Sequence, residues 1–83
     1  MFDYNDMIAI NFISTDQKIN KFPISCVKTD TFAEIEEKLY KEYPAFRETN
    51  NTLIVNGGTV LRFKTMGENR IKSGDTIQVI KSE

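Results

Sequence analysis

The chain of 83 residues contains no histidine and a single cysteine, Cys26. Without histidine, no imidazole can serve as a catalytic base or as a metal ligand. One cysteine cannot form an internal disulfide or a thiolate metal cluster, and it fits a reducing intracellular setting. These features disfavour catalysis. We therefore expect that the protein is not an enzyme and that it uses no metal and no cofactor.

The sequence also has no long apolar run and no excess of either charge. Its apolar stretches fall far short of a membrane span, and residues 1–6 have neither the basic start nor the apolar core of a signal peptide. Eleven basic residues stand against twelve acidic ones, for a net charge of −1. This balance argues against electrostatic binding to nucleic acid or to a membrane surface. We expect a cytoplasmic or nuclear monomer with no nucleic-acid and no membrane partner.

The composition is that of one small globular domain. Hydrophobic residues make up 40% of the chain and charged residues 28%, which is too apolar for a disordered protein. A domain of this size needs most of its apolar residues for its core. We expect a flexible leader at residues 1–6, a folded domain at 7–81 and a short tail at 82–83.

The first part of the domain predicts two strands. Ile8 and Ile10 begin an alternation of apolar residues with period two, which is typical of a half-buried strand. After a short polar turn, residues 19–27 show the same alternation and predict a second strand, so the two form a hairpin. Pro23 has no backbone N–H to donate, so this second strand should lie at an edge of the sheet or carry a bulge.

The next segment has the period of a helix. Thr31 and Glu34 have the spacing of a capping box, and Pro44 stops the helix near residue 42 or 43. Glu37 and Lys41 stand four residues apart in the favourable order for an ion pair. The apolar stripe of this helix consists of Phe32, Ile35 and Leu39. The glutamates that we expect on its solvated face are Glu34, Glu36, Glu37 and Glu42.

The remaining pattern completes an α+β fold. Phe46 should anchor a polar connection, and strands are predicted at 52–55, 59–63 and 76–80. One helix can cover only one face of a sheet, so we expect a mixed sheet of four or five strands with the last strand parallel to the first. This architecture is the β-grasp. The expected core includes Ile8, Ile10, Ile35, Leu39, Leu53, Ile77 and Val79.

From residue 7 to residue 80 the sequence resembles ubiquitin and its relatives. The most specific stretch is TMGENRIKSGDTIQV at 65–79, which resembles the family pattern of Thr-Leu, a small turn, Asn-x-Ile, a charged turn and Thr-Leu-x-Leu. LIVNGG at 53–58 resembles the third strand and its glycine turn. The resemblance implies a role in the ubiquitin pathway. The implied partner is a protein, such as a ubiquitin receptor or a protein associated with the proteasome or a ligase.

Several positions depart from the family pattern. Asn69 stands where many relatives have a tyrosine, and residues 62–64 replace an expected Asp-Gly pair. Covalent modifiers of this family end in Gly-Gly, whereas this chain ends in Glu83. We therefore expect a binding domain within a larger protein. The alternative is a covalent modifier whose Gly-Gly tail is absent from this chain, and a sulfur carrier is disfavoured on the same ground.

The resemblance also points to an apolar patch on the open face of the sheet. Its strand positions correspond to Ile54, Gln78 and Ile80. The alternation supports this placement independently, because neighbours on the same strands should face the helix. Ile13 should extend the patch from the first strand. The alternative is that these are scattered surface residues without a function, which are common in folded proteins.

Overall fold

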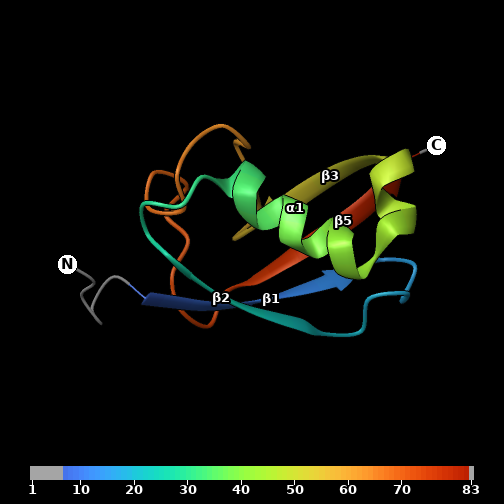
Figure 1. Ribbon diagram of the computed structural model, residues 1–83, viewed down its shortest axis with the longest axis horizontal. Coiled ribbons are helices and arrows are strands. Elements are labelled where there is room, and N and C mark those ends of the chain that lie inside the picture. Colours follow the sequence, from blue (N-terminus) through green and yellow to red (C-terminus); the bar gives the residue numbers. More distant parts are fainter. Residues whose placement is uncertain (1–6, 83) are drawn as a thin grey trace.

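The computed structural model describes residues 7–82, so the expected leader at 1–6 and Glu83 lie outside the described residues. Its elements follow one another along the chain as in Figure 1. They are β1 (Met7–Ser14), β2 (Phe22–Val27), α1 (Phe32–Glu42), the 3-10 helix η2 (Pro44–Glu48), β3 (Asn50–Val55), β4 (Gly58–Thr59) and β5 (Thr76–Ser82). No helix in the described part of the chain is both long enough and apolar enough to cross a membrane.

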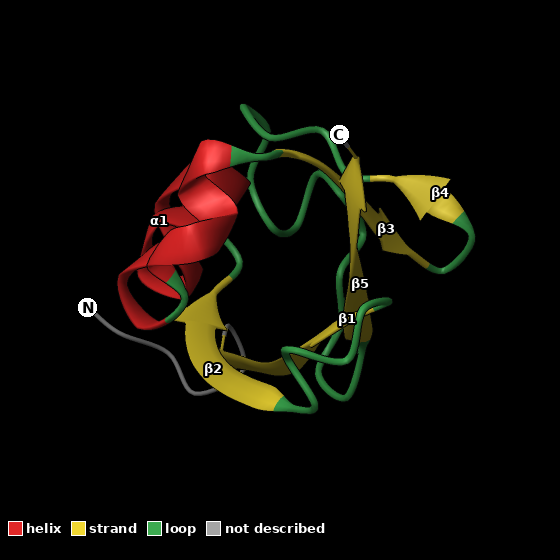
Figure 2. Ribbon diagram, turned by 90° about the vertical axis from the view of Figure 1, so that its right-hand side faces the viewer, coloured by secondary structure: helices red, strands yellow, loops and turns green. Residues whose placement is uncertain are grey.

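The five strands form one mixed sheet in the order β2-β1-β5-β3-β4. The last strand, β5, lies in the centre, parallel to β1 and antiparallel to β3. Figure 2 shows α1 packed against one face of the curved sheet. The predicted α+β β-grasp architecture is therefore confirmed, including the parallel pairing of the first and last strands. Pro23 lies on the edge strand β2, as predicted.

The core lies between α1 and the sheet. All seven residues predicted for it are buried, and Phe12, Phe32 and Met66 are fully enclosed with them. Phe12 and Phe32 meet edge to face with ring centroids 6.2 Å apart, which joins β1 to the start of the helix. Phe46 is also buried, so the predicted anchor of the connection after α1 is confirmed.

The second strand begins later than predicted. It starts at Phe22, whereas the alternation predicts an extended chain over residues 19–27. Ile19 is buried by a closed turn instead: its N–H donates to Ser14 Oγ (2.8 Å), and its carbonyl accepts from the Ser14 N–H (2.9 Å). These bonds fold the chain back on itself, so Ile19 joins the core from a loop.

The predicted capping box at the start of α1 is wrong. Thr31 is the N-cap residue, but its side chain makes no capping hydrogen bond. The first helical N–H groups, of Phe32 and Ala33, donate instead to the carbonyls of Lys64 and Arg62, each at 2.9 Å. A distant segment therefore satisfies the donors that a capping side chain normally binds.

The strand predicted at 59–63 is also wrong beyond its first residue, because β4 covers only Gly58–Thr59. The chain then turns away, and the side chain of Asn69 holds it there. Asn69 Oδ1 accepts from the Leu61 N–H (2.8 Å), and Asn69 Nδ2 donates to the Leu61 carbonyl (2.9 Å). In this segment the side chains of Leu61 and Phe63 are exposed, that of Phe63 to 88%.

Candidate functional site on the open face of the sheet

Three of the four predicted site residues form a row across the centre of the sheet. Ile13 on β1 is paired with Gln78 on β5, and Gln78 is paired with Ile54 on β3. We call these three residues the outer row. Neighbouring strands lie about 4.8 Å apart, so the row spans roughly 10 Å. Ile80, the fourth predicted residue, lies two positions along β5 from Gln78 and opposite Thr52.

The four residues point away from the core, as the alternation predicts. Each of them is half-buried, while their strand neighbours Leu53, Ile77 and Val79 are buried against the helix. Paired residues on adjacent strands point to the same side of a sheet. The structure thus brings the predicted residues together on the face opposite α1. That these residues bind a partner stays a prediction.

This open face carries almost no charge. Lys81, near the end of β5, is the one charged residue within the strands that the structure describes. The outward neighbours of the outer row are small or uncharged side chains: Ala9, Asn11, Thr52, Thr59 and Thr76. A partner that covers the outer row therefore need not remove an ionised group of this protein from water, which would be costly. Depletion of charge is also what distinguishes the cores of protein interfaces.

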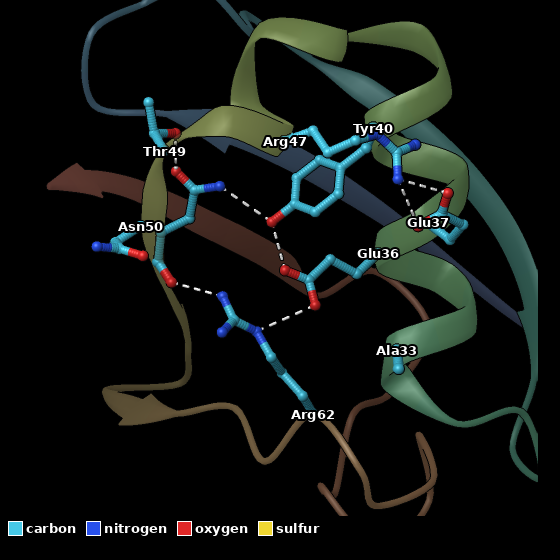
Figure 3. Close-up of a pocket in the computed structure, with 9 residues that line it drawn as sticks. Ala33, Glu36, Glu37, Tyr40, Arg47, Thr49, Asn50 and Arg62 are labelled. Atoms are coloured by element: carbon cyan, nitrogen blue, oxygen red, sulfur yellow. Dashed lines mark hydrogen bonds and ion pairs between the residues drawn. The ribbon is translucent and has the colours of Figure 1, made fainter. Parts of the chain in front are cut away.

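A second site, which the sequence did not predict, lies beside α1. It is a polar cavity of about 320 Å³ between α1, η2, β3 and Arg62. Figure 3 shows Glu36 at its centre, between Tyr40 and Arg62. Glu36 is only 7% exposed, so the prediction that it lies on a solvated face is wrong. Its Oε1 is 3.0 Å from Arg62 Nε, and its Oε2 accepts a hydrogen bond from the Tyr40 hydroxyl.

The polar groups around this cavity are bound to one another. Asn51 Nδ2 donates to Tyr40 Oη (3.0 Å) and to the Phe46 carbonyl (2.7 Å). Burial and the bond to Glu36 raise the pKa of Tyr40 to about 12, so its hydroxyl stays protonated and donates. In the described part of the chain, no buried side-chain nitrogen or oxygen is left without a partner. The arrangement therefore joins helix to sheet, and the buried side-chain groups among the described residues are bonded within the protein.

The ion pair predicted between Glu37 and Lys41 is also wrong. Glu37 Oε1 lies 2.7 Å from Arg47 Nη1, and the Arg47 guanidinium lies 5.7 Å from the centre of the Tyr40 ring. Both side chains of this ion pair are about half exposed, so it contributes little to stability.

Cys26 is enclosed and is not suited to chemistry as a nucleophile. It is 5% exposed on β2, as its place in the alternation predicts. Burial, followed by the charge of Asp30, raises the pKa of its thiol to about 11. Little thiolate therefore forms at neutral pH.

Known proteins resemble this chain closely in fold but only distantly in sequence. No family model matches the chain, and a search of the curated proteins finds no match. Among solved structures, a protein designed on the basis of ubiquitin superposes with a TM-score of 0.78 at 20% identity, covering 94% of this chain and 92% of that one. The Dsk2 UBL domain of Plasmodium falciparum gives a TM-score of 0.75 at 16% identity, over 92% of this chain and 99% of that domain.

Ubiquitin of Caldiarchaeum subterraneum gives a TM-score of 0.75 at 12% identity, covering 93% of this chain and 95% of that one. All three structures are ubiquitin-like and match almost the full length of both chains. The protein therefore has the ubiquitin-like β-grasp fold, and the resemblance found in the sequence is confirmed at the level of the fold.

Proposed function

We propose that this protein is a non-catalytic, ubiquitin-like protein-interaction domain that binds its partner through the open face of the sheet. The observation that carries the proposal is the uncharged outer row of Ile13, Gln78 and Ile54, with Ile80 beside it. Two features support it together: apolar side chains that face outward at the centre of a sheet, and only one charge, that of Lys81, among the described strand residues. The likeness to the Dsk2 UBL domain of Plasmodium falciparum supports the proposal, because that domain has a similar fold.

The expected affinity is low. Ile13, Ile54 and Ile80 are already half-buried in the free protein, so a partner removes only part of each side chain from water. Association must also offset the lost freedom of two molecules. We therefore expect a transient contact with a dissociation constant in the micromolar range or weaker. We propose that the domain itself is a monomer in the cytoplasm or nucleus, acting in the ubiquitin pathway.

The test uses charge substitutions on the open face. Proteins captured by the wild-type domain from its source cells are identified and purified, and their binding is then measured by calorimetry. Ile54→Glu and Ile80→Glu should each weaken binding at least about tenfold, because the new carboxylate must be desolvated in the contact. Ala45→Glu adds the same charge at an exposed position of η2, outside the sheet, and should leave binding unchanged.

Two controls keep the result interpretable. The circular-dichroism melts of the variants should lie close to that of the wild type, since the substituted side chains are outside the core. Backbone amide shifts in a titration should be largest around residues 13, 54, 78 and 80. Binding that survives both isoleucine substitutions would exclude this face as the site.

A further inference from the structure

An open cavity lies at one end of the sheet, formed by the segments that follow β2 and β3 and the segment that precedes β5. Its volume is about 740 Å³, and it lies where β3 ends and β5 begins. The residues that line it are Lys28, Asn56, Gly67, Arg70, Ile71, Lys72 and Asp75. We call it the basic cavity, because three of these side chains are cations and one is a carboxylate. Figure 1 shows the long connection between β4 and β5 (orange) at the end of the sheet where α1 begins.

The backbone around the basic cavity is held in place. The Gly67 N–H donates to the Lys28 carbonyl (2.9 Å), and a Cβ at Gly67 would lie 3.4 Å from that oxygen, so the two segments approach closely. Ile71 is buried, and its N–H donates to the Met66 carbonyl (3.1 Å). Arg70 lies between these anchors with a φ of 58°. The backbone that carries the three cationic side chains is therefore held by hydrogen bonds and by the buried Ile71.

The charge of the basic cavity is not balanced from within. The ion pairs that the structure shows among residues 7–82 involve Arg47 and Arg62, and neither joins Lys28, Arg70 or Lys72 to a carboxylate. Asp75 uses its carboxylate otherwise, because its Oδ2 accepts from the Lys72 N–H (2.8 Å) and from Asn56 Nδ2 (3.2 Å).

Two further carboxylates belong to neighbouring turns. Asp30 accepts from the Val27 N–H, and Glu68 accepts from the Thr65 N–H; neither lines the cavity. A chain with a net charge of −1 thus gathers three cations in one place, and no carboxylate among residues 7–82 forms an ion pair with them.

The basic cavity can be reached by the same partner that covers the outer row. Asn56 follows Ile54 by two residues, a distance of about 7 Å along an extended chain. Asp75 directly precedes β5, which carries Gln78. A protein that lies over Ile54 and Gln78 can therefore extend its chain by a few residues into the cavity.

We propose that the basic cavity binds an acidic segment of the protein partner, with aspartate or glutamate side chains facing Lys28, Arg70 and Lys72. The inference rests on the proposed function, since it names the chemistry of the segment that adjoins the apolar contact. Charge complementarity selects carboxylates, and no aromatic side chain among the described residues lines the cavity to stack on a nucleic-acid base.

The test separates the cavity from the outer row by using a probe without apolar residues. The full chain is titrated with a hexaglutamate peptide at low ionic strength, and binding is followed through backbone amide shifts. The test variant combines Lys28→Gln, Arg70→Gly and Lys72→Gln. Glycine suits the positive φ at position 70, and positions 28 and 72 are exposed, so this variant should remain folded. The matched control combines Lys18→Gln, Lys21→Gln and Lys41→Gln, which removes three exposed cations elsewhere.

With the wild type, the largest shifts should occur at residue 28 and at residues 67–75. The test variant should bind the peptide roughly five- to tenfold more weakly, as expected for the loss of three exposed charge pairs, and the control should change binding by less than about twofold. Equal weakening in both variants, or shifts spread over the whole surface, would overturn the proposal.

An oligonucleotide that binds the same residues more tightly than hexaglutamate would also overturn the proposal, in favour of a nucleic-acid ligand. If the outer row does not bind the partner, only the Ile54→Glu and Ile80→Glu variants would reveal it. The two proposals can therefore fail separately.

Discussion

Arg62→Ala is the substitution that best tests how the fold is held together on the side of the polar cavity. Removing the guanidinium takes away the cation beside Glu36 Oε1 and the donor to the Asn51 carbonyl. The Glu36 side chain is only 9% exposed, so water can replace the lost cation only in part. Tyr40 continues to bind the other carboxylate oxygen. We therefore expect a clear loss of stability without a change of fold.

The size of the loss follows from the exposure of the two partners. Breaking a fully buried ion pair costs about 3–5 kcal/mol, whereas an exposed pair is worth at most about 1 kcal/mol. Arg62 is 41% exposed and Glu36 is nearly enclosed, which places this pair between the two limits. We expect Arg62→Ala to reduce the free energy of unfolding by about 2 kcal/mol, which lowers the melting temperature by roughly 8–16 °C in a domain of this size.

The matched comparison is the ion pair between Arg47 and Glu37. It joins the same types of side chain, but its exposures are 48% and 53%. Urea denaturation of Arg62→Ala, Glu36→Gln and their combination gives the coupling energy of the buried pair, and the same three variants at positions 47 and 37 give that of the exposed pair. We expect about 1.5–2 kcal/mol for the first and less than about 0.5 kcal/mol for the second. Equal coupling energies would refute the argument that burial of Glu36 sets the strength of its ion pair.

Two further predictions concern Cys26 and Asn69. Burial raises the pKa of the Cys26 thiol from 9.0 in the unfolded chain to about 11, so the stability associated with this group is fully present below pH 9 and declines as the pH rises towards 11. A thiol reagent at pH 8 should modify native Cys26 slowly and urea-unfolded Cys26 fast, and equal rates would contradict its burial. Asn69→Ala removes both side-chain bonds to Leu61, so we expect a loss of about 1 kcal/mol in urea denaturation. We also expect faster amide hydrogen exchange at residue 61, and unchanged exchange there would show that the loop is held by other contacts.

The sequence predicts the framework of this fold because the framework depends on periodicity. The alternation along β1, β3 and β5 places Ile13, Ile54, Gln78 and Ile80 on one face, and the stripe of α1 places Phe32, Ile35 and Leu39 in the core. These features are local, so each can be read from a few consecutive residues. The paired register that makes the outer row required the structure, because pairing between distant strands leaves no local signal.

The features that the sequence does not predict depend on contacts between distant residues. Glu36 follows the inward-facing Ile35, but its burial requires Arg62, 26 positions further along the chain. The capping box has the right residues at Thr31 and Glu34, yet backbone carbonyls from 62 and 64 take the place of the side chain. The segment 59–63 has residues that favour a strand, but Asn69 bends it away from the sheet. In each case a contact with residues outside the segment overrides its local preference.

The central position of β5 has a consequence for how the protein is made. The hairpin of β1 and β2 can form as soon as its residues leave the ribosome, but it has no neighbour on its inner side until β5 arrives. β3 likewise depends on β5 for its long antiparallel pairing. Synthesis must therefore reach Val79 and pass beyond it before the two halves of the sheet can join around Ile77 and Val79. During translation, the isoleucines of the incomplete sheet remain accessible to chaperones until this last strand inserts.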